Sequence, residues 1–247
     1  MKSRSSLPEY LKELQLVWCL QHHEELAQQA AQQGWAHPDY LEHLLEGECH
    51  RRRENRTRRR LQAARFPVQK TLDAFDWSWP KKIDRTHVMD LMRLAFLEDK
   101  TNVILLGGVG LGKSHVATAI GRQACLQGHS VLWTTAIEMV NVLVAAQAAQ
   151  RLRQELKKYF APDLLILDEL GYLPIDKQGA DLLFQVVSAR YERGSILLTT
   201  NRPFKQWAAI FNNDNTLASA VLDRLLHHAQ TLVIEGQSYR MKDQVNP

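Results

Sequence analysis

The pattern of apolar positions divides the chain into a helical N-terminal part and a larger part in which strands and helices alternate. Between residues 7 and 33, Leu and Trp side chains recur near a helical spacing, which predicts one amphipathic helix. A second helix is expected to open at Pro38 and to run into the stretch CHRRRENRTRRR, where apolar residues disappear for about three turns. We therefore expect a small all-α domain over residues 1–65.

Residues 66–83 show neither a helical nor a strand period, although they contain four aromatic residues. This composition predicts a linker that lies on the surface of the following domain. Packing of Trp77 and Trp79 against the core is favoured over their stacking on a base or on adenine. Asp84 is a suitable N-cap for a further helix, whose apolar positions continue to Phe96.

The remaining residues, 84–247, alternate short apolar runs with helical stretches. The predicted strands are Val103–Leu106, Val131–Thr134, Leu164–Leu167, Ile196–Thr199 and Leu232–Ile234. Helices are expected near 113–127, 136–159, 178–192 and 216–227. Continuous apolar strands that alternate with helices indicate an α/β domain built on a buried, five-stranded parallel sheet. Ligands of such sheets bind at the carboxyl ends of the strands, so the candidate chemistry is sought there.

A glycine-rich segment follows the first of these strands and precedes a helix. Gly107–Ser114 reads GGVGLGKS and fits the phosphate-binding pattern G-x-x-x-x-G-K-[ST]. Glycines let the backbone turn its N–H groups towards a phosphate, and the N-terminus of the next helix adds a favourable dipole. Lys113 is expected to reach the β- and γ-phosphates and Ser114 to bind Mg²⁺.

Two further strands end in polar residues that suit nucleotide hydrolysis. Asp168 and Glu169 close the apolar run LLIL, so Asp168 is expected to hold Mg²⁺ and Glu169 to polarise the attacking water. The alternative is that the pair caps the next turn. Asn201 ends another strand and is expected to contact the γ-phosphate or the water, and an Asx-turn before Arg202-Pro203 is the alternative.

Charge is distributed unevenly along the chain. The formal net charge is +4, yet residues 1–50 carry three basic and eight acidic side chains, whereas residues 51–65 carry eight arginines and one glutamate. A basic block of this kind either forms a solvated face or contacts a polyanion such as DNA. The candidate DNA-binding residues of this block are Arg51, Arg52, Arg53, Arg56, Arg58, Arg59 and Arg60.

Several classes of protein are excluded by the sequence. There is no run of about 18 apolar residues, so a membrane span is not expected, and the N-terminus lacks the apolar region of a secretory signal. Three scattered cysteines fit a reducing, cytoplasmic setting. The Cys and His residues near Cys19 and Cys49 are poorly spaced for a tetrahedral zinc site, so no zinc is expected there.

Five segments together resemble one family closely. The segments GGVGLGKSH, LLILDELGYLP, RYERGSILLTTN, LASAVLDRLLHH and GQSYRMK are similar to those of the IstB-like ATP-binding proteins of bacterial insertion sequences. These proteins are transposition helper ATPases of the AAA+ superfamily, near the DnaC-like helicase loaders. The resemblance implies a bacterial, cytoplasmic ATPase that uses ATP and Mg²⁺. Its implied partners are double-stranded DNA, a cognate transposase and further copies of itself in a ring, spiral or filament.

The resemblance also assigns roles by position. It implies that Asn201 is sensor 1, that Arg224 is an arginine finger acting on a neighbouring subunit's nucleotide, and that Arg240 is the sensor 2 arginine. The chain after Arg224 is too short for a full helical lid, which is therefore expected to be reduced. The nucleotide-binding set is Gly107, Gly108, Val109, Gly110, Leu111, Gly112, Lys113, Ser114, His115 and Arg240.

An additional helix is expected between the second and third strands. Residues 135–163 read as two helices where a crossover needs one, which resembles the insertion of the initiator and loader branch of AAA+ proteins. The family places this insertion near DNA, and its second half carries the basic residues Arg151, Arg153, Lys157 and Lys158. A solvated helix face is the alternative.

Two other functions fit the nucleotide motifs. A replicative helicase loader would share all of the nucleotide chemistry and differ in its partner. A monomeric P-loop kinase or NTPase of metabolism would have no use for Arg224 as a finger. The segments RYERGS and NRPFKQW, with the arginine block, favour the transposition helper.

Overall fold

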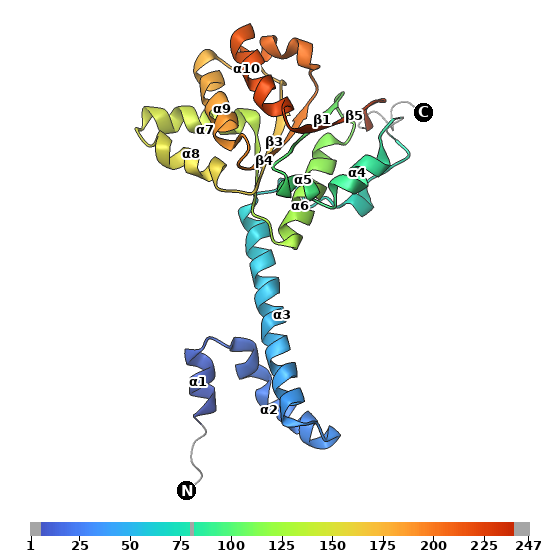
Figure 1. Ribbon diagram of the computed structural model, residues 1–247, viewed down its shortest axis with the longest axis vertical. Coiled ribbons are helices and arrows are strands. Elements are labelled where there is room, and N and C mark those ends of the chain that lie inside the picture. The colour runs from blue at the N-terminus through green and yellow to red at the C-terminus, as the bar shows by residue number, and fades with distance from the viewer. Residues whose placement is uncertain (1–5, 80–81, 240–247) are drawn as a thin grey trace. The chain divides into compact units, whose positions relative to one another are not determined.

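The computed structural model describes residues 6–79 and 82–239, and the chain divides into two compact units at Arg59 and Arg60. The first unit contains α1 (Leu7–Glu13), α2 (Val17–Gln33) and most of α3 (His37–Ala63), as Figure 1 shows. The prediction of a single helix over residues 7–33 is therefore wrong, because the structure has two helices there. Gln15 adopts φ 56°, which ends α1 and starts a new helix two residues later.

The core of the first unit explains this break. Leu11 of α1, Cys19 of α2 and Leu44 of α3 are buried against one another. The Cys19 Sγ donates to the Leu44 carbonyl oxygen at 3.3 Å, so this thiol is used within the helical core. Separate helices let α1 and α2 both turn an apolar side chain towards α3.

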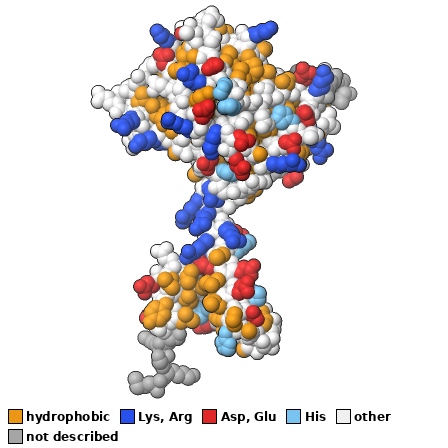
Figure 2. Space-filling view, viewed as in Figure 1, with side chains coloured by type: hydrophobic (Ala, Val, Ile, Leu, Met, Phe, Trp, Pro, Cys, Tyr) orange, Lys and Arg blue, Asp and Glu red, His pale blue; other side chains and the backbone are white. Residues whose placement is uncertain are grey.

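Helix α3 continues through the basic stretch as expected, and Figure 2 shows Lys and Arg side chains gathered along it. Glu48, which is 2% exposed, accepts hydrogen bonds from the Trp18 amide at 2.7 Å, Arg51 Nη2 at 2.7 Å and Arg52 Nε at 2.9 Å. Burial alone would raise the pKa of Glu48, but these bonds outweigh it and lower the pKa to about 2. Two arginines of the block are thus committed to a buried carboxylate.

The second unit is built on a five-stranded parallel sheet, which confirms the predicted α/β class. Its strands are β1 (Asn102–Gly107), β2 (Val131–Thr135), β3 (Leu164–Leu170), β4 (Ser195–Thr200) and β5 (Ala229–Ile234). Their order is β2-β3-β4-β1-β5. This order places the carboxyl ends of β1, β3 and β4 side by side, so the polar residues predicted at those ends meet at one edge.

Helices cover both faces of the sheet (Figure 1). They are α4 (Arg85–Leu91), α5 (Ala95–Glu98), α6 (Lys113–Gln127), α7 (Ala136–Ala148), α8 (Leu152–Phe160), α9 (Lys177–Arg190) and α10 (Asn215–Leu226). Side chains alternate between two apolar clusters along β3. Leu165 and Leu167 belong to the cluster under α7, α9 and α10, whereas Leu164 and Ile166 belong to the cluster under α6. A single 3-10 turn lies at Leu72–Ala74, and a longer 3-10 helix of eight residues lies at Phe204–Phe211.

The helix expected from Asp84 is confirmed at its start and wrong in its extent. The Asp84 carboxylate accepts from the His87 amide at 2.9 Å, as an N-cap does. The helix then ends at Leu91, and Leu94 with φ 66° turns the chain before α5. This turn allows Leu94 and Phe96 to be buried together.

Two helices, α7 and α8, separate β2 from β3, as the sequence predicts. The Arg190 side chain anchors the end of α8. Its guanidinium, on a residue only 2% exposed, donates to five backbone carbonyl oxygens, those of Tyr159, Phe160, Pro162, Asp163 and Ser195. Arg190, the first residue of RYERGS, therefore links the inserted helix to the start of β4. None of the described helices is long and apolar enough to cross a membrane.

Candidate nucleotide-binding site

The glycine-rich loop between β1 and α6 has a backbone that only glycine adopts easily. Gly110 and Gly112 have φ of 74° and 86°. A Cβ on Gly112 would lie 2.6 Å from the Phe75 ring, and one on Gly110 would overlap the Ser238 hydroxyl. The sequence pattern of the loop thus reflects both its conformation and the chain segments packed against it.

Lys113 is the first residue of α6 and its side chain lies over the loop. It is 7% exposed, and its Nζ donates to the Gly108 carbonyl oxygen at 2.6 Å. The ammonium group is therefore held at the loop, beside the N-terminus of α6, where a phosphate would meet both a positive charge and free helix N–H groups.

A hydrogen-bond network joins α6 to the ends of β3 and β4. Asp168 is 3% exposed, and its Oδ1 accepts from Ser114 Oγ at 2.9 Å and from the Thr199 hydroxyl. Asp168 and Ser114 are the two residues that the sequence predicted as Mg²⁺ ligands, and the structure brings them into direct contact. Both offer hard oxygen donors, so this pair fits a magnesium ion.

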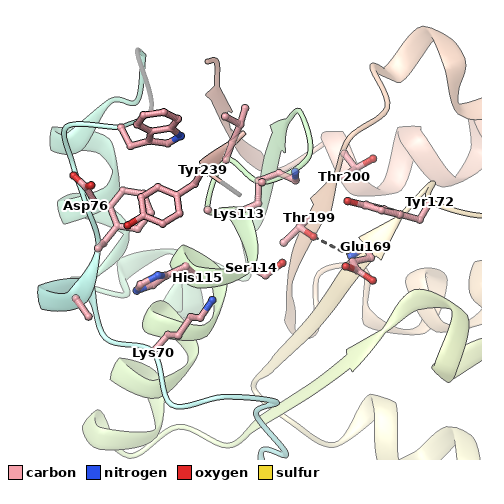
Figure 3. A pocket seen from close by; sticks show the side chains of 16 residues that line it. Lys70, Asp76, Lys113, Ser114, His115, Glu169, Tyr172, Thr199, Thr200 and Tyr239 are labelled. Carbon is pink, nitrogen blue, oxygen red and sulfur yellow. Dashed lines mark hydrogen bonds between the residues drawn. The ribbon is translucent and has the colours of Figure 1, made fainter. Parts of the chain in front are cut away.

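Glu169 occupies an irregular position at the end of β3. The pairing of β3 with β4 shifts between Leu167 and Leu170, and Glu169 adopts φ 62°. Its amide donates to Thr199 Oγ1 at 2.9 Å, and Figure 3 shows its carboxylate facing the cleft. Strained backbone of this kind persists where the surroundings enforce it, and here it aims a carboxylate into the site.

One cleft of about 270 Å³ is lined by Gly110, Gly112, Lys113, Ser114, Glu169 and Thr199, and Asp168 lies behind Ser114 and Thr199. The loop, α6 and the ends of β3 and β4 form one side of it, and the segment expected to be a linker forms the other (Figure 3). The lining residues that the sequence did not single out as site residues are Lys70, Ala74, Phe75, Asp76, Trp79, Tyr172, Thr199, Thr200 and Tyr239.

Aromatic contacts fix this second side of the cleft. Phe75 meets the His115 ring edge to face at 5.2 Å, and His115 Nε2 donates to the Thr71 carbonyl oxygen at 2.7 Å. Burial lowers the pKa of His115. Trp79 packs edge to face on Tyr239, whose amide donates to the Gly110 carbonyl oxygen at 2.9 Å. The segment is therefore tied directly to the phosphate-binding loop.

Six described residues of the predicted site lie outside this lining: Gly107, Gly108, Val109, Asp168, Asn201 and Arg224. Asn201 follows β4, and its Oδ1 is buried and accepts no hydrogen bond from the part of the chain that the structure describes. Arg224 lies on α10, where its Nη1 donates to the Ala220 carbonyl oxygen at 3.1 Å and its guanidinium stacks 4.7 Å above the Phe184 ring. Arg240 is outside the described residues.

In both basic stretches, most of the side chains form no ion pair with the described residues. On α8, Lys158 donates to Glu155 at 2.7 Å, whereas Arg151, Arg153 and Lys157 are exposed and have no ion pair among the described residues. On α3, Arg51 and Arg52 bind Glu48, and Arg58 donates to Asn55. The exposed arginines of α3 beyond this pair are Arg53, Arg56, Arg58 and Arg59, and Arg60 lies in the second unit.

Sequence reasoning missed Thr199 and the linker side of the cleft. The signal for Thr199 was available, because a Thr-Thr pair closes an otherwise apolar strand next to Asn201. The aromatic residues of the linker also stood out, but only the folded chain shows that Phe75 and Trp79 face the phosphate-binding loop.

Comparison with known proteins agrees with this geometry. The sequence model of the IstB-like ATP binding proteins matches residues 9–246. The chain is 41% identical over 233 residues to an insertion sequence IS21 putative ATP-binding protein of Pseudomonas aeruginosa, which covers 94% of this chain and 88% of the relative. It is 35% identical over 243 residues to an insertion sequence IS5376 putative ATP-binding protein of Geobacillus stearothermophilus, covering 98% and 96%.

Solved structures show the same fold at low sequence identity. AMPPCP-bound DnaA from Aquifex aeolicus superposes with a TM-score of 0.58 at 20% identity, over 72% of this chain and about half (54%) of that chain. The DnaC helicase loader superposes with a TM-score of 0.53 at 19% identity, over 67% and 96%. The expected AAA+ fold with its inserted helices is thereby confirmed. With a family match along almost the whole sequence, the chain belongs to the IstB-like ATP-binding proteins.

Proposed function

We propose that this ATP-binding protein hydrolyses ATP and uses the cycle to assemble on double-stranded target DNA and help a transposase. The observation that carries the hydrolytic part is the contact between Ser114 and Asp168 at the phosphate-binding loop, with the Glu169 carboxylate beside it in the same cleft. Side chains for binding phosphate, holding a divalent cation and orienting water thus meet at one point.

Each residue of the cleft has a distinct role in this proposal. Lys113 leaves the Gly108 carbonyl and binds the β- and γ-phosphates, while the loop amides hold their oxygens. Ser114 and Asp168 would hold Mg²⁺, and the bound ion would neutralise charge on the phosphates. Glu169 accepts a hydrogen bond from the attacking water and polarises it, and Thr199 keeps both acidic residues in place.

The linker side of the cleft suits the base of the nucleotide. Phe75 and Trp79 offer apolar and aromatic surface beside the loop, and Tyr239 closes that side through its bond to Gly110. Aromatic faces favour stacked or edge contacts with a planar ring. We assign the adenine to this side because the opposite side carries the lysine that suits phosphate and the oxygen ligands that suit Mg²⁺.

Arg224 is assigned to a cleft formed with a second copy of the chain. It is absent from the lining of its own cleft, and its guanidinium rests on Phe184 at the surface between α9 and α10. A cation supplied by a neighbour to the γ-phosphate makes hydrolysis depend on assembly. Asn201, whose Oδ1 has no described donor, is assigned to the water or the γ-phosphate.

DNA contact is assigned to α8 before α3. The three unpaired basic side chains of α8 are exposed on the inserted hairpin of helices, and oligomerisation would repeat them along a duplex. Phosphate contacts of this kind add electrostatically and carry no sequence information. The exposed arginines of α3 form the second candidate surface.

The transposase is assigned to the first unit on the basis of its surface. Apolar side chains remain exposed on its helices, and Figure 2 shows them close together on one face. The large apolar side chains that are exposed in this unit include Tyr10, Leu14, Val17, Leu41 and Leu45. Contiguous apolar surface marks a protein-binding site, and the insertion-sequence relatives make the transposase the favoured partner.

One binding experiment tests this helper role. Duplex binding is measured by fluorescence anisotropy with a non-hydrolysable ATP analogue for the wild type and for Lys113→Ala. The DNA-bound protein is then offered a transposase and, in a separate sample, a replicative helicase. We expect nucleotide-dependent binding only in the wild type, followed by transposase capture. Capture of a replicative helicase in place of the transposase would favour the loader, and nucleotide-independent binding would contradict the proposal.

A further inference from the structure

Three side chains with metal-binding atoms meet at the surface, away from the nucleotide cleft. Glu192 lies in the turn after α9, His227 is the C-cap of α10 and His228 follows it. One ligand atom from each residue lies within 4.8 Å of the other two, and this is the single such group of three among the described residues. The nucleotide chemistry proposed above does not use any of them.

The geometry of the group needs little change to surround an ion. His228 Nε2 lies 3.8 Å from Glu192 Oε1, and the two imidazole rings are 4.2 Å apart between centroids. Ligand atoms around tetrahedral zinc are separated by about 3.4 Å, given bonds of about 2.0–2.1 Å. The side chains of His228 and Glu192 are 53% and 58% exposed, so small rotations can close the remaining gap without disturbing the core.

His227 is already oriented by a neighbour. Its Nδ1 forms a hydrogen bond of 2.8 Å with the Tyr191 hydroxyl. Histidines that bind metals usually have such an outer hydrogen-bond partner, which fixes the plane of the ring. Tyr191 and Glu192 are adjacent in sequence, so one turn supplies both a ligand and the group that positions another ligand.

The local electrostatics favour a cation. The group lies at the C-terminal end of α10, a helix of twelve residues, where unsatisfied carbonyl groups give a partial negative charge. Two imidazoles and one carboxylate suit zinc, cobalt or nickel better than magnesium or calcium, which prefer oxygen ligands alone. The fourth position is left for water or for a group from another molecule.

We propose that Glu192, His227 and His228 bind one divalent transition-metal ion of the zinc class. The ion joins the α9–β4 turn to the end of α10, three residues from Arg224. Because two segments far apart in sequence supply the ligands, the ion restrains the helix that carries the proposed arginine finger. The site exists independently of ATP hydrolysis and is tested without it.

The test uses the full-length protein without a histidine tag, freed of metal by EDTA and kept free of nucleotide. Cobalt(II) is titrated and followed by visible absorption, and zinc binding is measured by calorimetry. We expect one ion per chain whose affinity falls by more than about 100-fold in the double variant His227→Ala/His228→Ala. Tyr191→Phe should weaken binding by about 10–100-fold, as loss of an outer partner does.

A matched control distinguishes a three-ligand metal site from an ordinary ion pair at the surface. His50 and Glu54 on α3 lie 3.2 Å apart and are 73% and 60% exposed, but no third ligand from the described residues joins them. His50→Ala is expected to leave cobalt binding unchanged. Equal cobalt stoichiometry and affinity in the wild type and in the His227→Ala/His228→Ala variant would overturn the proposal and leave the group as an ion pair only.

Discussion

Arg190 gives a prediction whose size follows from the structure. This buried guanidinium donates to five backbone carbonyl oxygens, and four of these bonds are between 2.8 and 3.1 Å long. Charge-assisted bonds contribute about 1.5 kcal/mol each at the low end of their range. Burial opposes them, because it lowers the pKa of Arg190 from 12.5 to about 10, which corresponds to about 3 kcal/mol. The net contribution of the side chain is about 3 kcal/mol.

Arg190→Leu is therefore expected to lower the free energy of unfolding by about 3 kcal/mol, since the carbonyls lose their donor inside the protein. Urea unfolding followed by circular dichroism measures this loss. Hydrogen exchange should show that the amides of α8 open first, because Arg190 holds the carbonyls of Tyr159 and Phe160 at its end. Arg193→Leu, three residues on and exposed, is the matched control and should change stability by less than about 0.5 kcal/mol. A loss below 1 kcal/mol in Arg190→Leu would refute this reasoning.

Further predictions concern the site, the first unit and DNA. Thr199→Val should retain the fold but reduce ATP turnover more than ATP binding, because Asp168 and the Glu169 amide lose the hydroxyl that joins them. Turnover equal to that of the wild type in a steady-state assay would count against this role of Thr199. The pKa of Glu48 is lowered to about 2 on folding, so about 3 kcal/mol of stability should be present above pH 4.5 and be lost as the pH falls towards 2. Thermal unfolding at several pH values checks this, and a Glu48→Gln variant with the same pH dependence would contradict it. Alanine at Arg151, Arg153 and Lys157 should flatten the salt dependence of duplex binding by up to about 0.9 in log–log slope per lost phosphate contact. An unchanged slope would move the interface to α3.

The strands and the phosphate-binding loop were predictable because each depends on local sequence. Apolar runs such as Leu164–Leu167 have no helical alternative of sufficient length, and the loop glycines have a conformational requirement that few other residues meet. Asp84 as an N-cap and the two inserted helices are also confirmed for this reason.

The errors lie where long-range packing decides the conformation. Gln15 and Leu94 end helices with positive φ although neither residue type favours it, because the buried neighbours on either side must face a common core. Glu48 was overlooked as a partner of the arginine block because it precedes the block by one turn. The linker's place over the cleft depends on contacts such as that of Phe75 with Gly112, which connect distant parts of the chain.

In the proposed function, ATP is hydrolysed by Glu169 of one copy together with Arg224 of the next copy. A mixing experiment tests this division of roles between two copies. Arg224→Ala and Glu169→Gln proteins should each bind ATP but turn it over slowly, since an arginine finger contributes about 10³–10⁵ in rate. In a mixed oligomer, the intact Arg224 of one chain faces the intact Glu169 of its neighbour. The account predicts that the mixture regains a measurable part of the wild-type turnover. A mixture as inactive as its components, when cross-linking shows that mixed oligomers have formed, would contradict it.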